Sequence, residues 1–237
     1  MKVCVVTGAN SGIGKAVAGA LLKDGNKVYC IGGPDGFKEK EDSGNAVYVS
    51  CDFRNTGDIV KAAGIPEETS VDVLVNAAGV AYYGLAESVK SSEISDMVDV
   101  NVKAPLMLTS ALMPKIRKAS GTVVNISSVT AKAFASPHGA AYGATKAALS
   151  SFGRSLFEEV RKQGVRVINI HPDLTETNLY RNADFTVSGE PDETLFAEDI
   201  AEFVKLSLNA RNGLCVTDVT LRPQKNRIVK KNSGKSL

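Results

Sequence analysis

The chain of 237 residues has no tryptophan, only two histidines and only four cysteines. With so few imidazole and thiol groups, and no cysteines spaced like metal ligands, we expect no metal site. Each cysteine lies in an apolar run typical of a strand, which predicts buried free thiols in a reducing compartment such as the cytoplasm. These residues are Cys4, Cys30, Cys51 and Cys215.

The chain also lacks a strong excess of either charge and any long apolar run. It has 28 Lys and Arg against 26 Asp and Glu, a net charge of +2. A balance so close to neutral argues against nucleic acid or an anionic membrane as partner. No apolar stretch approaches the roughly 20 residues of a membrane span. The opening residues MKVCVVTG are too short for the apolar core of a signal peptide.

Apolar runs of strand length alternate with longer segments of helical period along most of the chain. The Val- and Ile-rich runs are typical of strands buried on both faces, so we predict a doubly wound, Rossmann-like parallel sheet of about seven strands, an α/β fold with helices on both faces. Strands are expected at 2–8, 26–33, 46–52, 71–79, 121–128, 165–172 and 215–223. Helices are expected at 12–25, 56–64, 91–116, 142–163 and 197–208.

A single domain is predicted over residues 1–223, followed by a solvated basic tail at 224–237. Pro105 lies inside the third segment of helical period, 91–116, and predicts a bend or break there. Residues 175–195 interrupt the alternation, which indicates a substrate-facing loop or, alternatively, a disordered surface loop. This loop is polar and short of large apolar residues, which favours a small or medium substrate.

A glycine-rich turn, TGANSGIG (Thr7–Gly14), links the first strand to the first helix. Gly8 permits a sharp turn, Gly12 lets a phosphate approach the backbone, and Gly14 permits close packing of helix on strand. The helix N-terminus then offers free N–H groups to a pyrophosphate. A purely structural glycine turn is the alternative.

The end of the second strand bears on the choice between NAD and NADP. Many dinucleotide folds place an acidic residue there for the ribose 2′-hydroxyl, but this chain has Gly32 and Gly33. Without a carboxylate a 2′-phosphate is not repelled, which favours NADP, and Lys38 or Asn10 could assist. Asp35 could supply the acid if the loop bends back, so NAD stays open.

A serine, a tyrosine and a lysine follow the fifth predicted strand in the order Ser128, Tyr142 and Lys146. The tyrosine and lysine are spaced i, i+4 and share one helix face. A nearby ammonium lowers a phenol's pKa, so the pair could exchange a proton near neutral pH, with Ser128 holding the substrate oxygen. Alone, this spacing would more often mark an exposed helix face.

Together these motifs resemble the short-chain dehydrogenase/reductase family, of the TGxxxGxG and YxxxK type, over nearly the whole chain. The resemblance implies a catalytic set of Asn101, Ser128, Tyr142 and Lys146, and a homodimer or homotetramer. It implies that Asp52 contacts adenine, that the NAAG segment closes the fourth strand, and that HPDLTET flanks the nicotinamide. The implied cofactor-binding residues are Gly8, Asn10, Ser11, Gly12, Ile13, Gly14, Asp52, Asn76, Ala77, Tyr142, Lys146, Pro172 and Thr177.

The sequence departs from the family's pattern at two points. Asp173 stands where glycine is usual, and the interval from Ser128 to Tyr142 is one residue longer than the commonest spacing. Neither change removes a catalytic group. Tyr82 and Tyr83, just after NAAG, could form a wall of the pocket or pack the loop.

The predicted function is an NADP(H)-dependent oxidoreductase that interconverts a carbonyl and an alcohol, with a small-molecule substrate. Hydride transfer would be the cofactor's part and proton transfer that of Tyr142. The alternative is a dinucleotide-binding regulator or sensor without turnover, which would not need the complete catalytic set. A sugar-nucleotide epimerase fits less well, because it usually has another glycine spacing and a longer C-terminal region.

Overall fold

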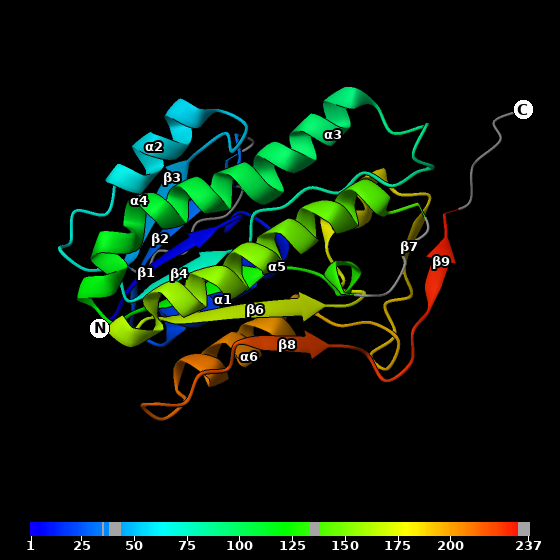
Figure 1. The fold of residues 1–237 in the computed structure, drawn as a ribbon. Coiled ribbons are helices and arrows are strands. Elements are labelled where there is room, and N and C mark those ends of the chain that lie inside the picture. The colour runs from blue at the N-terminus through cyan, green and yellow to red at the C-terminus, as the bar shows by residue number, and fades with distance from the viewer. Residues whose placement is uncertain (35, 38–43, 133–137, 232–237) are drawn as a thin grey trace, which may run out of the picture.

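The computed structural model describes residues 1–34, 36–37, 44–132 and 138–231. Its centre is a seven-stranded parallel sheet in the order β3-β2-β1-β4-β5-β6-β8, which confirms the predicted doubly wound fold (Figure 1). The strands are β1 (Val3–Thr7), β2 (Lys27–Gly32), β3 (Ala46–Ser50), β4 (Val73–Asn76), β5 (Thr122–Ile126), β6 (Arg166–Pro172) and β8 (Asp218–Leu221).

Helices cover both faces of this sheet (Figure 1). One apolar core lies under α1 (Gly12–Lys23) and α6 (Ala197–Leu208). The other lies under α2 (Thr56–Gly64), α4 (Ala104–Lys118) and α5 (Ala140–Val160). Strand residues alternate between the two cores: Val5 faces the second and Val6 the first. This is why the strands have nearly continuous apolar sequences.

The long helix predicted over 91–116 is interrupted, as Pro105 suggested. It divides into α3 (Ser91–Val98), a π-helical turn η1 (Asp99–Lys103) and α4, with Pro105 in the first turn of α4. Proline has no N–H to donate to the helical ladder, and the π-helical turn ends just before Pro105, where the ladder loses that bond. The π-helical turn holds the buried Asn101, and such turns occur often at functional sites.

The strand order reverses between β1 and β4, and the carboxyl ends of these strands meet at one edge of the sheet. Ligands of doubly wound folds bind at this switch point. Three of the cysteines are buried near it or in the cores, as predicted, but Cys215 is exposed in the loop before β8. The expectation of a fourth buried thiol is therefore wrong, because the last strand begins only at Asp218.

Residues beyond β8 do not simply extend into solvent. Strand β9 (Ile228–Lys230) pairs antiparallel with β7 (Phe185–Val187), which belongs to the predicted substrate loop. The basic segment predicted as a tail thus contributes a strand, and its last residues, 232–237, lie outside the described part of the chain. Within the described residues, no helix has the length and apolar character needed to cross a membrane.

Candidate active site

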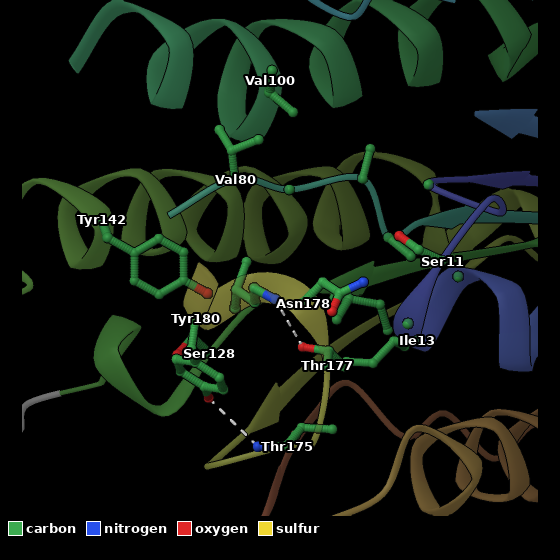
Figure 2. A pocket seen from close by; sticks show the side chains of 18 of the residues that line it. Ser11, Ile13, Val80, Val100, Ser128, Tyr142, Thr175, Thr177, Asn178 and Tyr180 are labelled. Atoms are coloured by element: carbon green, nitrogen blue, oxygen red, sulfur yellow. Dashed lines mark hydrogen bonds between the residues drawn. The ribbon is translucent and has the colours of Figure 1, made fainter. Parts of the chain in front are cut away.

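A cavity of about 900 Å³ opens at the carboxyl ends of the central strands (Figure 2). All but two of the predicted site residues line it, although they come from segments far apart in the sequence. The two exceptions are Asn76 and Asn101. Asp35 and Lys38, which bore on the cofactor choice, lie outside the described residues.

The glycine turn forms one end of the cavity. Gly8 has φ +67°, and a Cβ added there would lie 2.8 Å from the backbone of Ala78. A Cβ on Gly14 would lie 2.4 Å from the carbonyl oxygen of Gly8. Side chains at either position would fill the turn or push it apart, so the cradle requires glycine. Ser11 stands as N-cap of α1, whose first N–H groups point into a space that suits a pyrophosphate.

Residues that follow β4 and residues of the loop after β6 complete this part of the cavity. Thr7 Oγ1 accepts hydrogen bonds from the backbone N–H groups of Ala77 and Ala78, at 3.0 and 3.1 Å. Thr177 lies across the glycine turn, since a Cβ on Gly12 would be 3.2 Å from its methyl carbon. The cradle is therefore bounded on both sides by predicted cofactor-binding residues, and its shape fits a dinucleotide.

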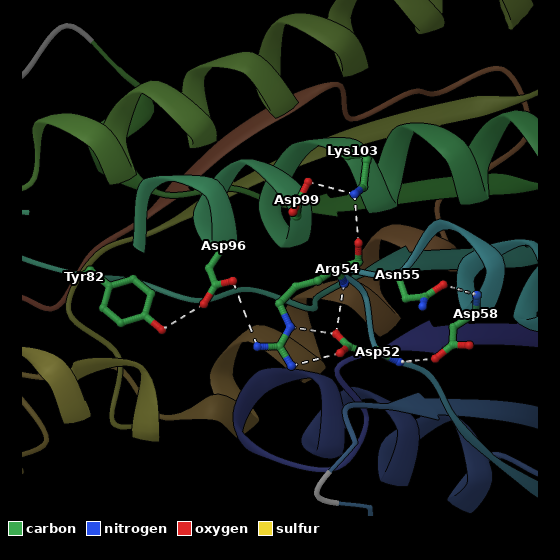
Figure 3. Close-up of polar contacts among 8 residues, drawn as sticks. All are labelled: Asp52, Arg54, Asn55, Asp58, Tyr82, Asp96, Asp99 and Lys103. Carbon is green, nitrogen blue, oxygen red and sulfur yellow. Dashed lines mark hydrogen bonds and ion pairs between the residues drawn. The ribbon is translucent and has the colours of Figure 1, made fainter. Parts of the chain in front are cut away.

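Asp52, which comes shortly after β3, also lines the cavity and belongs to a chain of polar contacts (Figure 3). The Arg54 guanidinium donates two hydrogen bonds of 2.9 Å to the two carboxylate oxygens of Asp52. These bonds hold the pKa of Asp52 below its usual value. Arg54 also lies 4.0 Å from Asp96, which accepts a hydrogen bond from Tyr82. No local motif marks Arg54, because its position at the site depends on its pairing with Asp52 in the folded chain.

Tyr142 and Ser128 lie close together on the cavity wall (Figure 2), and Lys146 lines the same cavity. Ser128 caps the short helix η2 (Val129–Ala131), and its Oγ accepts hydrogen bonds from the N–H and the hydroxyl of Thr130. With both of these bonds accepted, the proton of Ser128 is left to donate toward the Tyr142 hydroxyl or a substrate oxygen. The neighbouring Ser127 points elsewhere, since its hydroxyl donates to the carbonyl of Lys146 and lies 2.7 Å from the hydroxyl oxygen of Ser150.

Burial dominates the titration of the tyrosine and the lysine. It raises the pKa of Tyr142 above the usual value of a phenol, and the hydrogen bond from Ser128 opposes this. Burial also lowers the pKa of Lys146 to about 8. The lysine Nζ donates to the Ile126 carbonyl at 2.9 Å and lies 5.8 Å from the centre of the Tyr142 ring. The expected lowering of the tyrosine pKa by Lys146 is therefore not what this structure shows, because the two groups are both desolvated.

Asn101 is fully buried and does not line the cavity, but it bonds to residues that do. Its side-chain amide accepts from the N–H of Val80 and donates to the carbonyl of the same residue, both at 2.9 Å. It also donates to Thr145 Oγ1, which in turn donates to the carbonyl of Tyr142. The π-helical turn thus holds the segment after β4 against the helix that carries the tyrosine.

Asn76 is placed differently from the prediction. It is 2% exposed and donates to Thr109 Oγ1 and Asn125 Oδ1, at 3.1 and 2.9 Å. Its side chain joins neighbouring strands and α4, and it does not line the cavity. Its neighbour Ala77 does.

Asp173, the departure from the family's glycine, is tied to the C-terminal part of the chain. Its carboxylate accepts from Arg222 Nε at 2.7 Å and from Asn226 Nδ2 at 3.1 Å. Pro172 lies beside it at the end of β6 and lines the cavity, as predicted. No group of His, Cys, Asp and Glu side chains suited to a metal occurs among the residues that the structure describes.

Comparison with known proteins agrees with this geometry. The chain belongs to the short-chain dehydrogenase family, whose model matches residues 2–186. A Staphylococcus epidermidis protein named as an uncharacterized oxidoreductase is 34% identical over 229 residues, which is 94% of this chain and 97% of the relative. The chain is thus a member of an oxidoreductase family.

Solved structures show the same fold. An alcohol dehydrogenase of the archaeon Thermococcus sibiricus, complexed with 5-hydroxy-NADP, has a TM-score of 0.85 at 24% identity and covers 96% of this chain and 98% of its own. A metagenomic short-chain oxidoreductase in complex with NADP has a TM-score of 0.75 at 29% identity, covering 94% of this chain and 96% of its own.

Proposed function

We propose that this protein is an NADP(H)-dependent oxidoreductase that interconverts a carbonyl and an alcohol, with Tyr142 as general acid and base. The observation that carries the proposal is that Tyr142, Ser128 and Lys146 line the same cavity as the glycine cradle. A bound nicotinamide would supply or accept the hydride. The glycine turn, Asp52 and Thr177 would hold the dinucleotide.

The protein's own part is proton transfer and orientation. In reduction, the Tyr142 hydroxyl donates its proton to the substrate oxygen as negative charge develops there. Ser128 donates a hydrogen bond to the same oxygen and so stabilises that charge. Below a pH of about 8, Lys146 is an ammonium beside both groups and adds to this stabilisation.

The first experiment is to follow consumption of NADPH, and separately of NADH, by the purified protein with aldehydes, ketones and quinones. Turnover of any carbonyl compound would support the proposal. Tight NADPH binding without turnover of the panel would favour the alternative of a dinucleotide-binding regulator. We also propose a homodimer or homotetramer in the cytoplasm, which light scattering and cell fractionation would test.

The preference for NADP is supported by the NADP complex of the 29% identical relative and by the glycines at the end of β2. Gly33 lines the cavity with nothing within 4 Å of an added Cβ, so it can accept a side chain. Gly33→Asp is expected to lower kcat/KM with NADPH by about 10–100-fold, because a new carboxylate repels a 2′-phosphate. The value with NADH should fall much less.

Gly33→Asn is the matched control, since it adds the same volume without charge. It should leave the NADPH/NADH ratio within a few-fold of the wild type. An equal loss with both cofactors in Gly33→Asp would contradict the placement of the 2′-phosphate beside Gly33.

The pH dependence of the two directions should differ. Burial raises the pKa of Tyr142, so the phenol stays protonated, as reduction requires, throughout the neutral range. We expect kcat/KM for reduction to stay level from pH 6 to 7 and to decline from about pH 8 upward as Lys146 loses its proton, whereas kcat/KM for alcohol oxidation, which requires the phenolate, should rise with pH. Initial rates in both directions would test this, and a reduction rate that falls by half before pH 7 would contradict it.

A further inference from the structure

Three aromatic rings gather beside that of the proposed acid, Tyr142. The Tyr83 ring centre lies 5.7 Å from that of Tyr142, 6.2 Å from Tyr180 and 5.1 Å from Phe185. Tyr180 and Phe185 are themselves 5.4 Å apart. All four residues line the cavity. A substrate whose carbonyl oxygen contacts the Tyr142 hydroxyl must therefore place the rest of its structure next to aromatic faces and edges.

Two of these rings come from the loop at 175–195, which looked polar in the sequence. Tyr180 belongs to the short helix η4 (Asn178–Asn182), and its hydroxyl accepts a hydrogen bond from the N–H of Thr175 (Figure 2). Phe185 begins strand β7. The fold thus concentrates the few large apolar side chains of this loop at the cavity.

The rings of Tyr83, Tyr180 and Phe185 form an aromatic wall of the cavity. The C-terminal segment at 222–231 holds this aromatic wall in place. The β7–β9 ladder sets Phe185 opposite Lys230, and Lys231 Nζ donates to the carbonyl of Tyr180 at 2.7 Å. Lys225 forms an ion pair of 2.6 Å with Asp192. Ile228 of β9 lines the mouth of the cavity. The basic segment therefore belongs to the walls of the site.

The charged side chains that line the cavity already have protein partners. Arg54 and Asp52 form a bidentate pair, and Asp96 is bonded by Tyr82. Asp173 is bonded by Arg222 and Asn226, the exposed Arg181 donates to the carbonyl of Asn178, and Lys146 donates to that of Ile126. Among the lining residues that the structure describes, the carboxylates all accept hydrogen bonds from side chains, whereas the cations Lys146 and Arg181 donate to neutral backbone carbonyls.

From the aromatic wall beside Tyr142, we infer that the site takes neutral carbonyl compounds that carry a planar apolar ring next to the carbonyl, such as aryl aldehydes and ketones. This rests on the proposed function, since it names the substrate class of the same site. An aromatic substrate can make offset or edge contacts with Tyr83 and Phe185 that a saturated ring cannot make equally well. A carboxylate on the far side of the ring would lie among Tyr83, Tyr180 and Phe185, where it would lose its water without gaining a charged partner from these rings.

Four aldehydes with NADPH would test the inference: benzaldehyde, cyclohexanecarboxaldehyde, butanal and 4-formylbenzoate. We expect kcat/KM for benzaldehyde to exceed that for cyclohexanecarboxaldehyde by about 2–10-fold, the usual worth of an aromatic pair. Butanal should be poorer still, and 4-formylbenzoate should lose at least about 100-fold against benzaldehyde. Equal values for benzaldehyde and 4-formylbenzoate, or a preference for butanal, would overturn the inference.

Substitutions in the aromatic wall test whether the ring of the substrate binds there. Phe185→Leu keeps apolar volume and should lower the preference for benzaldehyde over cyclohexanecarboxaldehyde, whereas Phe185→Ala should lower kcat/KM for both. Ile228→Ala should raise KM for the ring substrates. Val229→Ala is the matched control, because Val229 is 39% exposed on the same strand and does not line the cavity. An unchanged substrate preference in Phe185→Leu would count against a ring bound at this wall.

Binding of benzamide, which is neutral, aromatic and not reduced, separates this inference from the proposed function. Calorimetry should show benzamide binding to the wild type in the presence of NADPH, at least tenfold weaker binding to Phe185→Ala, and no binding of benzoate. That result without turnover of any aldehyde would support the ring site while overturning the carbonyl reductase. Turnover of aldehydes with equal binding of benzamide by the two proteins would do the reverse.

Discussion

Replacing Tyr142 with phenylalanine is expected to lower kcat for carbonyl reduction by about 10²–10⁴-fold, the usual contribution of a general acid. The ring would keep its place, since it packs against Ala81 and Met97 and lies 5.7 Å from Tyr83. Only the hydroxyl that faces the cavity beside Ser128 would be lost. The affinity for NADPH should therefore stay within a few-fold of the wild type, as measured by calorimetry.

A second tyrosine supplies the control for this variant. Tyr29 is buried in β2 and its hydroxyl donates to Glu68 at 2.7 Å, away from the cavity. Tyr29→Phe should leave kcat unchanged, although it also removes a buried hydroxyl. If Tyr142→Phe kept the wild-type kcat, Tyr142 could not be the acid, and the proton would have to come from Ser128 or water.

The parts of the site that the sequence predicts are those carried by contiguous motifs. The glycine turn, the Tyr142–Lys146 spacing and the strand periods depend on local geometry, so they can be located without knowing how distant segments pack. The carboxyl ends of parallel strands then gather these motifs at one edge, which is why most of the predicted residues line one cavity.

The remaining features depend on contacts between segments that carry no local signal. Strand β9 lies in a basic segment, and its three residues pair with only three residues of β7, too few for a period-2 pattern to be read. The pairing of Arg54 with Asp52 and the turning of Tyr180 and Phe185 toward Tyr83 likewise follow from tertiary packing. The buried bond between Asn76 of β4 and Asn125 of β5 also depends on packing that the NAAG motif alone does not reveal.

Lys146→Met is expected to abolish most turnover and to change how stability depends on pH. Lys146 is 4% exposed, and burial lowers its pKa to about 8 from the 10.5 of a free lysine. Below pH 8 the lysine is charged whether the chain is folded or unfolded, so the folded state bears the full cost of the buried ammonium, on the order of 3 kcal/mol. Between pH 8 and 10.5 the unfolded chain binds more protons, so the wild type gains stability as pH rises.

The variant lacks this titration. The free energy of unfolding of Lys146→Met, relative to the wild type, should therefore fall by about 2–3 kcal/mol between pH 7 and pH 10 in urea titrations without cofactor. Loss of the bond to the Ile126 carbonyl shifts the variant by a constant amount and does not alter this change. Lys61→Met, at an exposed position of α2, should show no such trend.

A flat difference between Lys146→Met and the wild type over that range would mean that Lys146 keeps its ordinary proton affinity when folded. The buried ammonium would then not be destabilising. If the stability difference changes with pH as expected, the buried ammonium of Lys146 destabilises the folded state. An apolar side chain at this position would then make the protein more stable. Such a residue is retained for what it does to a neighbouring group. The Lys146 Nζ lies 5.8 Å from the centre of the Tyr142 ring. The groups that this cation can affect are therefore Tyr142 and a ligand bound against Tyr142.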